Sequence, residues 1–150
     1  MAWSSITVAD LKDAKVSALV EACRTAALGT GQTDPVPNII TNVATRIRAE
    51  IAACATNQLD ADAAAIPADL KSLACRMIVR EAMSRIKRPL SEDEREEQRN
   101  DLRYLERISK CDVPVAATDN PIANEVQKGG AIEQASTPTR RATRETLAGL

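Results

Sequence analysis

The chain has 150 residues, enough for one domain with a hydrophobic core and too few for two. Apolar residues make up 44% of it, but 26 positions are alanine, phenylalanine is absent, and Trp3 and Tyr104 are its aromatic residues. This composition favours a helical protein with a thin, aliphatic core. The formal net charge of −1 excludes a strong overall attraction to nucleic acid or to anionic membranes.

The sequence contains no histidine, the commonest general base and the commonest zinc ligand. It also lacks a glycine-rich phosphate loop, a dinucleotide-binding glycine pattern and a serine nucleophile motif. We therefore expect a protein that is not an enzyme and that has no cofactor and no metal site.

The four cysteines lie far apart and form no paired C-x-x-C motif: Cys23, Cys54, Cys75 and Cys111. The N-terminus has no signal-peptide pattern, and no apolar run approaches membrane-spanning length. We expect a protein made in the cytoplasm, where thiols stay reduced, with the cysteines as small buried side chains on helices. The alternative is a disulfide or metal framework.

Thr7 and Asp10 form an N-cap pattern that predicts a first helix over residues 8–27. Glycines and prolines then end this helix. A second helix is predicted from about residue 37, because apolar residues recur there at spacings of three and four. They are Ile40, Val43, Ile47, Ile51 and Cys54.

After a small, polar loop over residues 55–65, Pro67 predicts the start of a third helix, which Pro89 ends. Ser91 and the acidic residues after it form a capping box, which predicts the start of a fourth helix. The narrow apolar seam of this helix consists of Leu102, Leu105 and Ile108. The predicted fold class is therefore all-α, a small four-helix bundle.

The chain from residue 113 onward carries prolines, a Gly129-Gly130 pair and few large apolar residues, so it cannot build a core of its own. We divide the chain into a helical domain over residues 1–112 and an extended, mostly irregular C-terminal arm over residues 113–150. The arm needs the surface of a partner to take one shape.

Several residues are candidates for contacts with other proteins. Trp3 is a large aromatic near a chain end, and it either completes the core or anchors an interface. Arg80, Arg85 and Arg88 belong to a basic group on the third helix. This group favours a structural or subunit-bridging face over a DNA-binding one, since stacking aromatics are missing. The arm contains an amphipathic segment, whose alternative is a solvated terminus: Arg140, Arg141, Arg144, Leu147 and Leu150.

The acidic residues at the start of the fourth helix have three interpretations. They complement the helix dipole on a solvated face, they bind a hard cation, or they line a channel and repel passing DNA. The first is favoured over the second, because successive helical residues do not converge on one point. The candidate channel-lining residues are Glu92, Glu94, Glu96 and Glu97.

Four features of the chain resemble the head-tail connector proteins of tailed bacteriophages, also called adaptor or head-completion proteins. They are Ile6–Leu11 before a short helix, the long amphipathic helix through Ile47, Ile66–Lys71 before the next helix, and Arg88–Ser91 before a charged last helix. The resemblance covers about residues 4–115 and rests on helix order, the residues at helix starts and chain length.

The resemblance implies a non-enzymatic virion protein in the neck between head and tail, assembled in the host cytoplasm. Copies of it form a ring, usually twelve-fold, that extends the DNA channel beneath the portal and docks the next component. The implied partners are further copies of the chain, the portal protein, and a tail-side neck or tail-completion protein. DNA passes through without sequence-specific binding, no membrane is involved, and an extended arm reaches the portal or a neighbouring subunit.

Two other functions stay open. The arginines of the third and fourth helices motivate a small DNA-binding packaging protein similar to the small subunit of a terminase. Trp3 or the arm motivates a regulatory or scaffolding bundle that binds a different protein.

Overall fold

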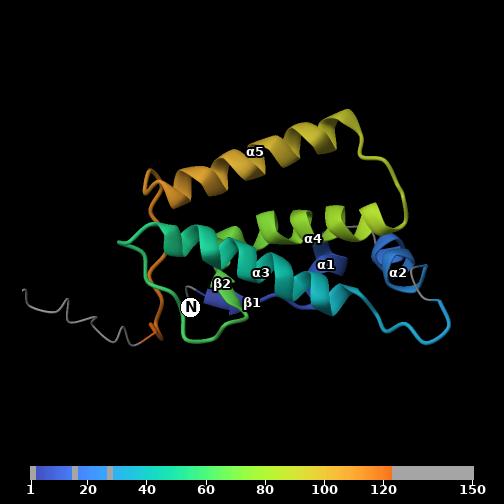
Figure 1. Cartoon of the computed structure of the whole chain (residues 1–150), viewed down its shortest axis with the longest axis horizontal. Helices are drawn as coiled ribbons and strands as arrows, with labels where there is room; N and C mark the ends of the chain where they lie inside the picture. The colour runs from blue at the N-terminus through green and yellow to red at the C-terminus, as the bar shows by residue number, and fades with distance from the viewer. Residues whose placement is uncertain (1–2, 15–16, 27–28, 123–150) are drawn as a thin grey trace, which may run out of the picture.

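The computed structural model describes residues 3–14, 17–26 and 29–122 (Figure 1). The prediction of a mostly helical protein is confirmed, and this part of the chain contains five α-helices and one two-stranded sheet. The helices are α1 (Val8–Ala14), α2 (Ser17–Thr25), α3 (Val36–Ala53), α4 (Lys71–Arg85) and α5 (Glu92–Ser109). The strands are β1 (Trp3–Ser5) and β2 (Ala65–Pro67), and a short 3-10 helix, η1 (Ala68–Leu70), follows β2.

The first predicted helix is wrong in its extent, because two helices, α1 and α2, take its place. Leu11 of α1 and Val20 of α2 are both buried, and both helices contact α4. The distance from residue 11 to residue 20 is about two and a half helical turns, which puts these side chains on opposite sides of a straight helix. One continuous helix could bury only one of them against α4.

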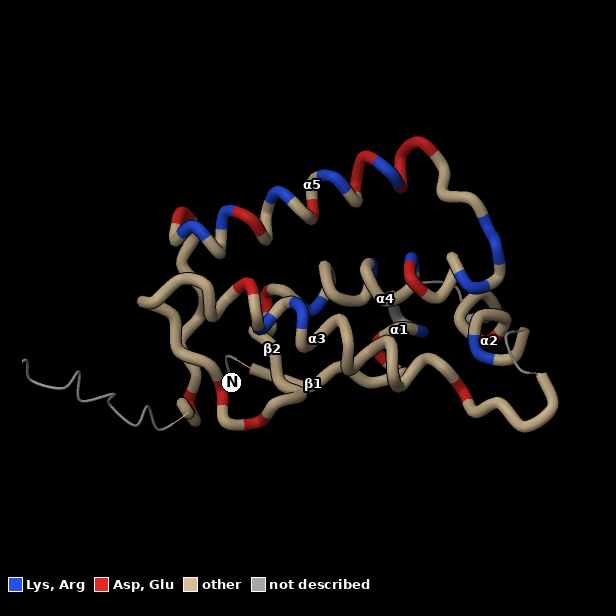
Figure 2. Tube along the Cα trace, in the orientation of Figure 1, with Lys and Arg blue, Asp and Glu red and all other residues tan. Residues whose placement is uncertain are grey.

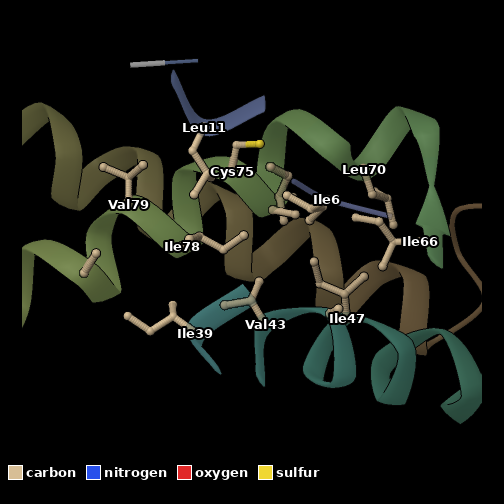
Figure 3. Packing of buried hydrophobic residues seen from close by; sticks show 14 of the residues in the cluster. Ile6, Leu11, Ile39, Val43, Ile47, Ile66, Leu70, Cys75, Ile78 and Val79 are labelled. Atoms are coloured by element: carbon tan, nitrogen blue, oxygen red, sulfur yellow. The ribbon is translucent and has the colours of Figure 1, made fainter. Parts of the chain in front are cut away.

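α3 and α4 carry the centre of the core. The predicted stripe of α3 is confirmed, except that Ile39 is buried in place of Ile40. Figure 3 shows Val43 and Ile47 on the side of α3 that faces Ile78 of α4. The core is aliphatic, as predicted, and the tryptophan at its edge is the one buried aromatic in the described residues.

A two-stranded sheet lies where the sequence predicted the end of a loop and the start of a helix. β1 pairs with β2 in the antiparallel direction, with Trp3 opposite Pro67. All three residues of β2 are buried, and a proline is tolerated in such a short pairing because little of the ladder depends on its missing N–H. The third predicted helix therefore begins later, with η1 at Ala68 and α4 at Lys71.

Arg48 of α3 attaches the loop between α3 and β2 to the body. Its guanidinium donates hydrogen bonds to the carbonyl oxygens of Asp60, Asp62 and Ala65, at 2.7, 2.9 and 2.8 Å. It also lies over the ring of Trp3, 5.7 Å from the centroid. The side chain is 8% exposed, so these carbonyls replace the water that a charged group requires.

The segment after α5, residues 111–122, runs back along this loop, and we call it the strap. The indole N–H of Trp3 donates to the carbonyl oxygen of Ala116 at 2.9 Å. The hydroxyl of Thr118 donates to the carboxylate of Asp60. The sequence predicted that this stretch needs a partner's surface, and here the chain's own first strand and loop provide one.

Cys54 and Cys111 form a disulfide that joins the end of α3 to the end of α5. The prediction of reduced thiols is wrong for these two cysteines and is confirmed for Cys23 and Cys75, which are free and buried. The bonded pair is 57 positions apart in the sequence. Their positions meet because α5 packs along α3, a tertiary contact that cysteine spacing does not reveal.

α5 begins as predicted. The hydroxyl of Ser91 accepts a hydrogen bond from the amide of Glu94, whose carboxylate accepts one from the amide of Ser91. Leu105 and Ile108 are buried, whereas Leu102 of the predicted seam is 39% exposed. The first half of α5 diverges from the body (Figure 1). The four-helix bundle is not confirmed, because the long helices among the described residues are α3, α4 and α5.

Arg48→Met is expected to lower the free energy of unfolding by about 3 kcal/mol, because three carbonyl oxygens lose charged hydrogen bonds. Urea denaturation followed by circular dichroism measures this change. Arg46→Met, on the exposed side of the same helix, is the matched control, with an expected change below about 0.5 kcal/mol. Equal losses in both variants would contradict the role of Arg48.

Ellman's reagent is expected to titrate two thiols, those of Cys23 and Cys75, in the denatured protein purified without reductant. Reduction is expected to lower the free energy of unfolding by about 4 kcal/mol, since the bond closes a loop that spans 57 positions. Four reactive thiols in the untreated protein would show that the bond does not form.

Candidate functional site

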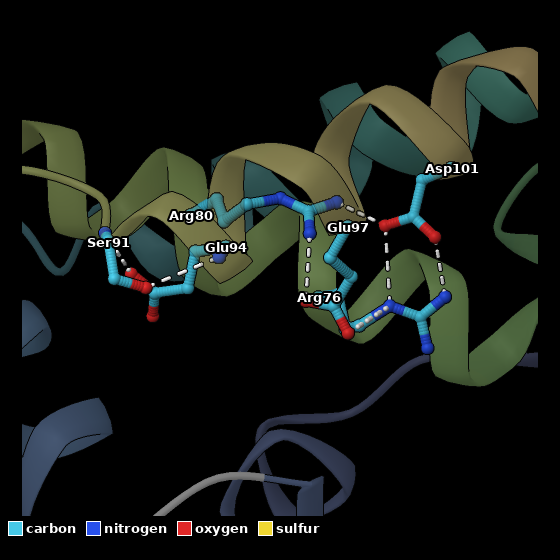
Figure 4. Close-up of polar contacts among 6 residues, drawn as sticks. All are labelled: Arg76, Arg80, Ser91, Glu94, Glu97 and Asp101. Atoms are coloured by element: carbon cyan, nitrogen blue, oxygen red, sulfur yellow. Dashed lines mark hydrogen bonds and ion pairs between the residues drawn. The ribbon is translucent and has the colours of Figure 1, made fainter.

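Four charged side chains join α4 to α5, and we call them the α4–α5 ion cluster (Figure 4). Arg76 and Arg80 are four positions apart on α4, and so are Glu97 and Asp101 on α5. Residues at this spacing share a helix face, so each pair points to the same side of its helix. Arg76 donates to both oxygens of Asp101, at 2.5 and 3.3 Å. Arg80 donates to Glu97 at 3.2 Å and also to Asp101.

Asp101 and Arg80 are the buried members of the cluster, with side chains 5% and 8% exposed. Burial alone would raise the pKa of Asp101, but the hydrogen bonds from Arg76 and Arg80 outweigh burial, so this pKa lies below its ordinary value. The same carboxylate raises the pKa of Arg76. Charge rather than apolar packing therefore attaches α5 to α4 at this point.

A groove of about 510 Å³ lies between α3, α4 and the middle of α5, where Gln98, Asp101 and Leu102 line it. We call it the three-helix groove. Its apolar lining consists of Val43, Met77, Leu90 and Leu102, and its polar lining of Asn42, Arg46, Arg80, Glu81, Ser84, Arg88, Gln98 and Asp101. The α4–α5 ion cluster contributes Arg80 and Asp101 to this lining, so the groove lies beside the place where charged side chains join α5 to α4.

The rim of the groove is basic. Arg46 and Arg88 are exposed and form no ion pair within the described residues, while Arg85 and Lys87 lie close to Arg88 at the end of α4. Figure 2 shows the basic residues around the end of α4. An aliphatic lining can bury apolar side chains, and exposed guanidinium groups can pair with carboxylates, so the lining of this groove is suited to binding another molecule.

The structure corrects two predicted interface residues. Trp3 is 8% exposed, because β1 pairs with β2 and the strap covers the ring, so it completes the core instead of anchoring an interface. Arg80 is buried in the α4–α5 ion cluster and is not available to a partner as a free charge. Arg85 and Arg88 are exposed, and they stay candidates.

The four predicted channel-lining residues lie in different environments. Glu94 is used in the capping box, and Glu97 turns toward α4 and pairs with its arginines. Glu92 and Glu96 are exposed. The four carboxylates therefore do not share one environment, and their place in a channel stays a prediction.

The remaining candidates belong to the arm. Its amphipathic segment lies outside the described residues and stays a prediction: Arg140, Arg141, Arg144, Leu147 and Leu150.

The sequence did not predict the three-helix groove or that Arg46, Met77 and Leu90 line it. One signal was available in α5, where the apolar seam runs back from Ile108 to Leu102 and then stops. Glutamine stands one turn before Leu102, at position 98, and charged residues precede it. A seam that stops halfway indicates that the first half of the helix has no apolar partner within the domain.

Within residues 3–14, 17–26 and 29–122, no three His, Cys, Asp or Glu side chains come together as a metal site would require. No helix in this part of the chain has the length and apolarity needed to span a bilayer.

Comparison with known proteins gives no match, whether to a protein-family model, a curated protein or a solved structure. The function is therefore inferred from the sequence and from the geometry of the groove and its surroundings.

Asp101→Asn is expected to lower the free energy of unfolding by about 3 kcal/mol, because buried Arg80 loses its buried counter-charge. Glu97→Gln, one turn earlier and 42% exposed, is the matched control and is expected to cost less than about 1 kcal/mol. Urea denaturation of both variants measures the difference. A larger loss for Glu97→Gln would contradict the central place of Asp101.

The pH dependence provides a second readout of the same variant. Because the pKa of Asp101 is lower in the folded chain than its ordinary value of 3.8, its stabilisation is complete above about pH 5 and is lost as pH falls through the folded pKa. The unaltered chain should therefore lose more stability in acid than Asp101→Asn does. Asp10, whose pKa the hydrogen bond from Lys71 lowers to about 2, contributes equally to both proteins.

Proposed function

We propose that the chain is a structural virion protein, a head-tail connector subunit that forms a ring between portal and tail. In the family it resembles, the ring is usually twelve-fold, extends the DNA channel and docks the next neck or tail component. The proposed location is the neck of the virion, after assembly in the host cytoplasm.

The observation that carries the proposal is where the resembling stretches lie in the fold. Ile6–Leu11 leads from β1 into α1, Ile66–Lys71 leads from β2 through η1 into α4, and Arg88–Ser91 leads to the capped start of α5. Each stretch therefore lies at the beginning of an element. This position at helix starts supports the proposal, with α1 and α2 in place of the single first helix that the sequence predicted.

The three-helix groove is a second support. The long helices leave Leu102 and the half-buried Met77 and Leu90 without full cover, so the domain has apolar surface that a neighbouring molecule can bury. A connector needs such a surface to dock the next neck or tail component, so the groove fits the proposed role.

The arm is proposed to contact the portal or a neighbouring subunit. The strap ends at Ile122, whose amide donates to the carbonyl oxygen of Leu59 at 2.9 Å. A further 28 residues follow it in the sequence. They follow a residue that is hydrogen-bonded to the loop between α3 and β2, so a contact made by the arm would be tethered to the ring.

Some of the residues that motivated the two alternatives are used within the fold. Arg76 and Arg80, which suggested phosphate contacts, are paired with carboxylates of α5. Trp3, which suggested docking of a different protein, is buried.

The full-length chain, mixed with the portal protein of the same phage, is expected to form ring-shaped complexes with it in negative-stain images. Native mass spectrometry of the mixture should show many copies of the chain for each portal ring. The absence of both a ring and a complex with the portal at micromolar concentration would overturn the proposal.

The chain without the portal is the control, and it is expected to stay smaller than the ring complex. Duplex DNA should not be retarded by the chain in a gel at low salt. Salt-dependent retardation, together with no portal complex, would favour the packaging-protein alternative.

A further inference from the structure

We propose that the three-helix groove binds an amphipathic α-helix of another protein, with aliphatic side chains on one face and carboxylates flanking them. The inference does not depend on a virion role, because it concerns the chemistry of the groove.

The shape of the groove favours a helix as its occupant. α3, α4 and α5 are the long helices of the described chain, and the first half of α5 diverges from the other two (Figure 1). The groove has a volume of about 510 Å³, the size of a small-molecule site, so it takes the side chains of one helix face rather than a whole helix. Three helices around an open groove leave the place that a fourth helix takes in a bundle, and amphipathic helices bind other proteins in this way.

The lining determines the apolar face of the occupant. Leu102 is 39% exposed although Leu105, three positions later on the same seam, is 2% exposed. Met77 and Leu90 are half-buried on the other walls of the groove. Methionine adapts its shape to a partner, and leucine side chains pack well against other aliphatic side chains. The lining is aliphatic rather than aromatic, so it suits the apolar face of a helix better than the bases of a nucleic acid.

The rim determines the charge of the occupant. Arg46 on α3 and Arg88 after α4 are exposed and have no carboxylate partner in the described residues, whereas Glu81 is the one acidic side chain of the lining outside the α4–α5 ion cluster. Carboxylates beside the apolar face of the partner would pair with both guanidinium groups. The chain's own residues 123–150 do not fit this requirement, since they contain three acidic and four basic residues.

The test uses a fluorescein-labelled synthetic peptide of about 18 residues, long enough for a helix of five turns, with leucines on one face and glutamates beside them. Fluorescence anisotropy with the full-length chain is expected to show micromolar binding. A peptide with lysines in place of the glutamates, and one with the leucine pattern scrambled, are expected to bind about tenfold more weakly or less. Hydrogen exchange should slow in α4 from Met77 to Ser84 and in α5 from Gln98 to Leu102.

Two pairs of variants locate the binding. Leu102→Asp is expected to weaken binding about tenfold. Ile122 on the strap has the size of leucine and is similarly exposed, at 44%. Ile122→Asp should change binding by less than about twofold. Arg46→Glu should weaken binding about fivefold, and Arg103→Glu, on the exposed side of α5, should not. All four side chains are exposed, and unchanged thermal unfolding of each variant separates lost binding from lost folding.

Three results would overturn the inference. They are no binding of the glutamate peptide at about 100 µM, equal affinity for the lysine or scrambled peptide, and equal weakening by Leu102→Asp and Ile122→Asp. Each of these results is independent of whether the chain forms a ring with a portal.

Discussion

The carboxylate of Asp101, shared by Arg76 and Arg80, is the polar link between α5 and α4, whereas α5 packs along α3 and buries Leu105 and Ile108. Two long arginine side chains fill the space between α4 and α5 that leucines would fill in an ordinary bundle. The helices are therefore bound to each other without close packing, and the first half of α5 has no apolar contact with α4. The three-helix groove is a consequence of this arrangement, because a direct leucine contact at the same place would close it.

Local sequence patterns correctly predicted the features that depend only on residues within the same helix. The capping box at Ser91 and the apolar stripe of α3 are of this kind, since both depend on neighbours within four positions. The break between α1 and α2 and the pairing of β1 with β2 were not predictable in this way. They follow from contacts with α4 and between segments about sixty residues apart, which local patterns do not contain.

Local patterns also did not predict which individual arginines of the candidate site are buried. Arg80 and Arg85 look alike in the sequence, yet one is buried against Asp101 and the other is exposed. Arg48 lies off the predicted apolar stripe of α3, yet it is buried and donates to three carbonyl oxygens of a loop that only the tertiary fold brings near. Which arginine binds inward depends on where the opposite carboxylate or carbonyl lies, and that position is set by the packing of the helices.

The strap and its disulfide have a mechanical consequence. Tension applied to the chain beyond Ile122 would first break the few hydrogen bonds of the strap to Leu59, Asp60 and Trp3. The load would then reach Cys111 and pass through the sulfur atoms to the end of α3, so that α5 is shielded from unwinding at its C-terminus. A pull on the C-terminal residues is thus carried by the helix at the centre of the core rather than by the helix nearest to them in sequence.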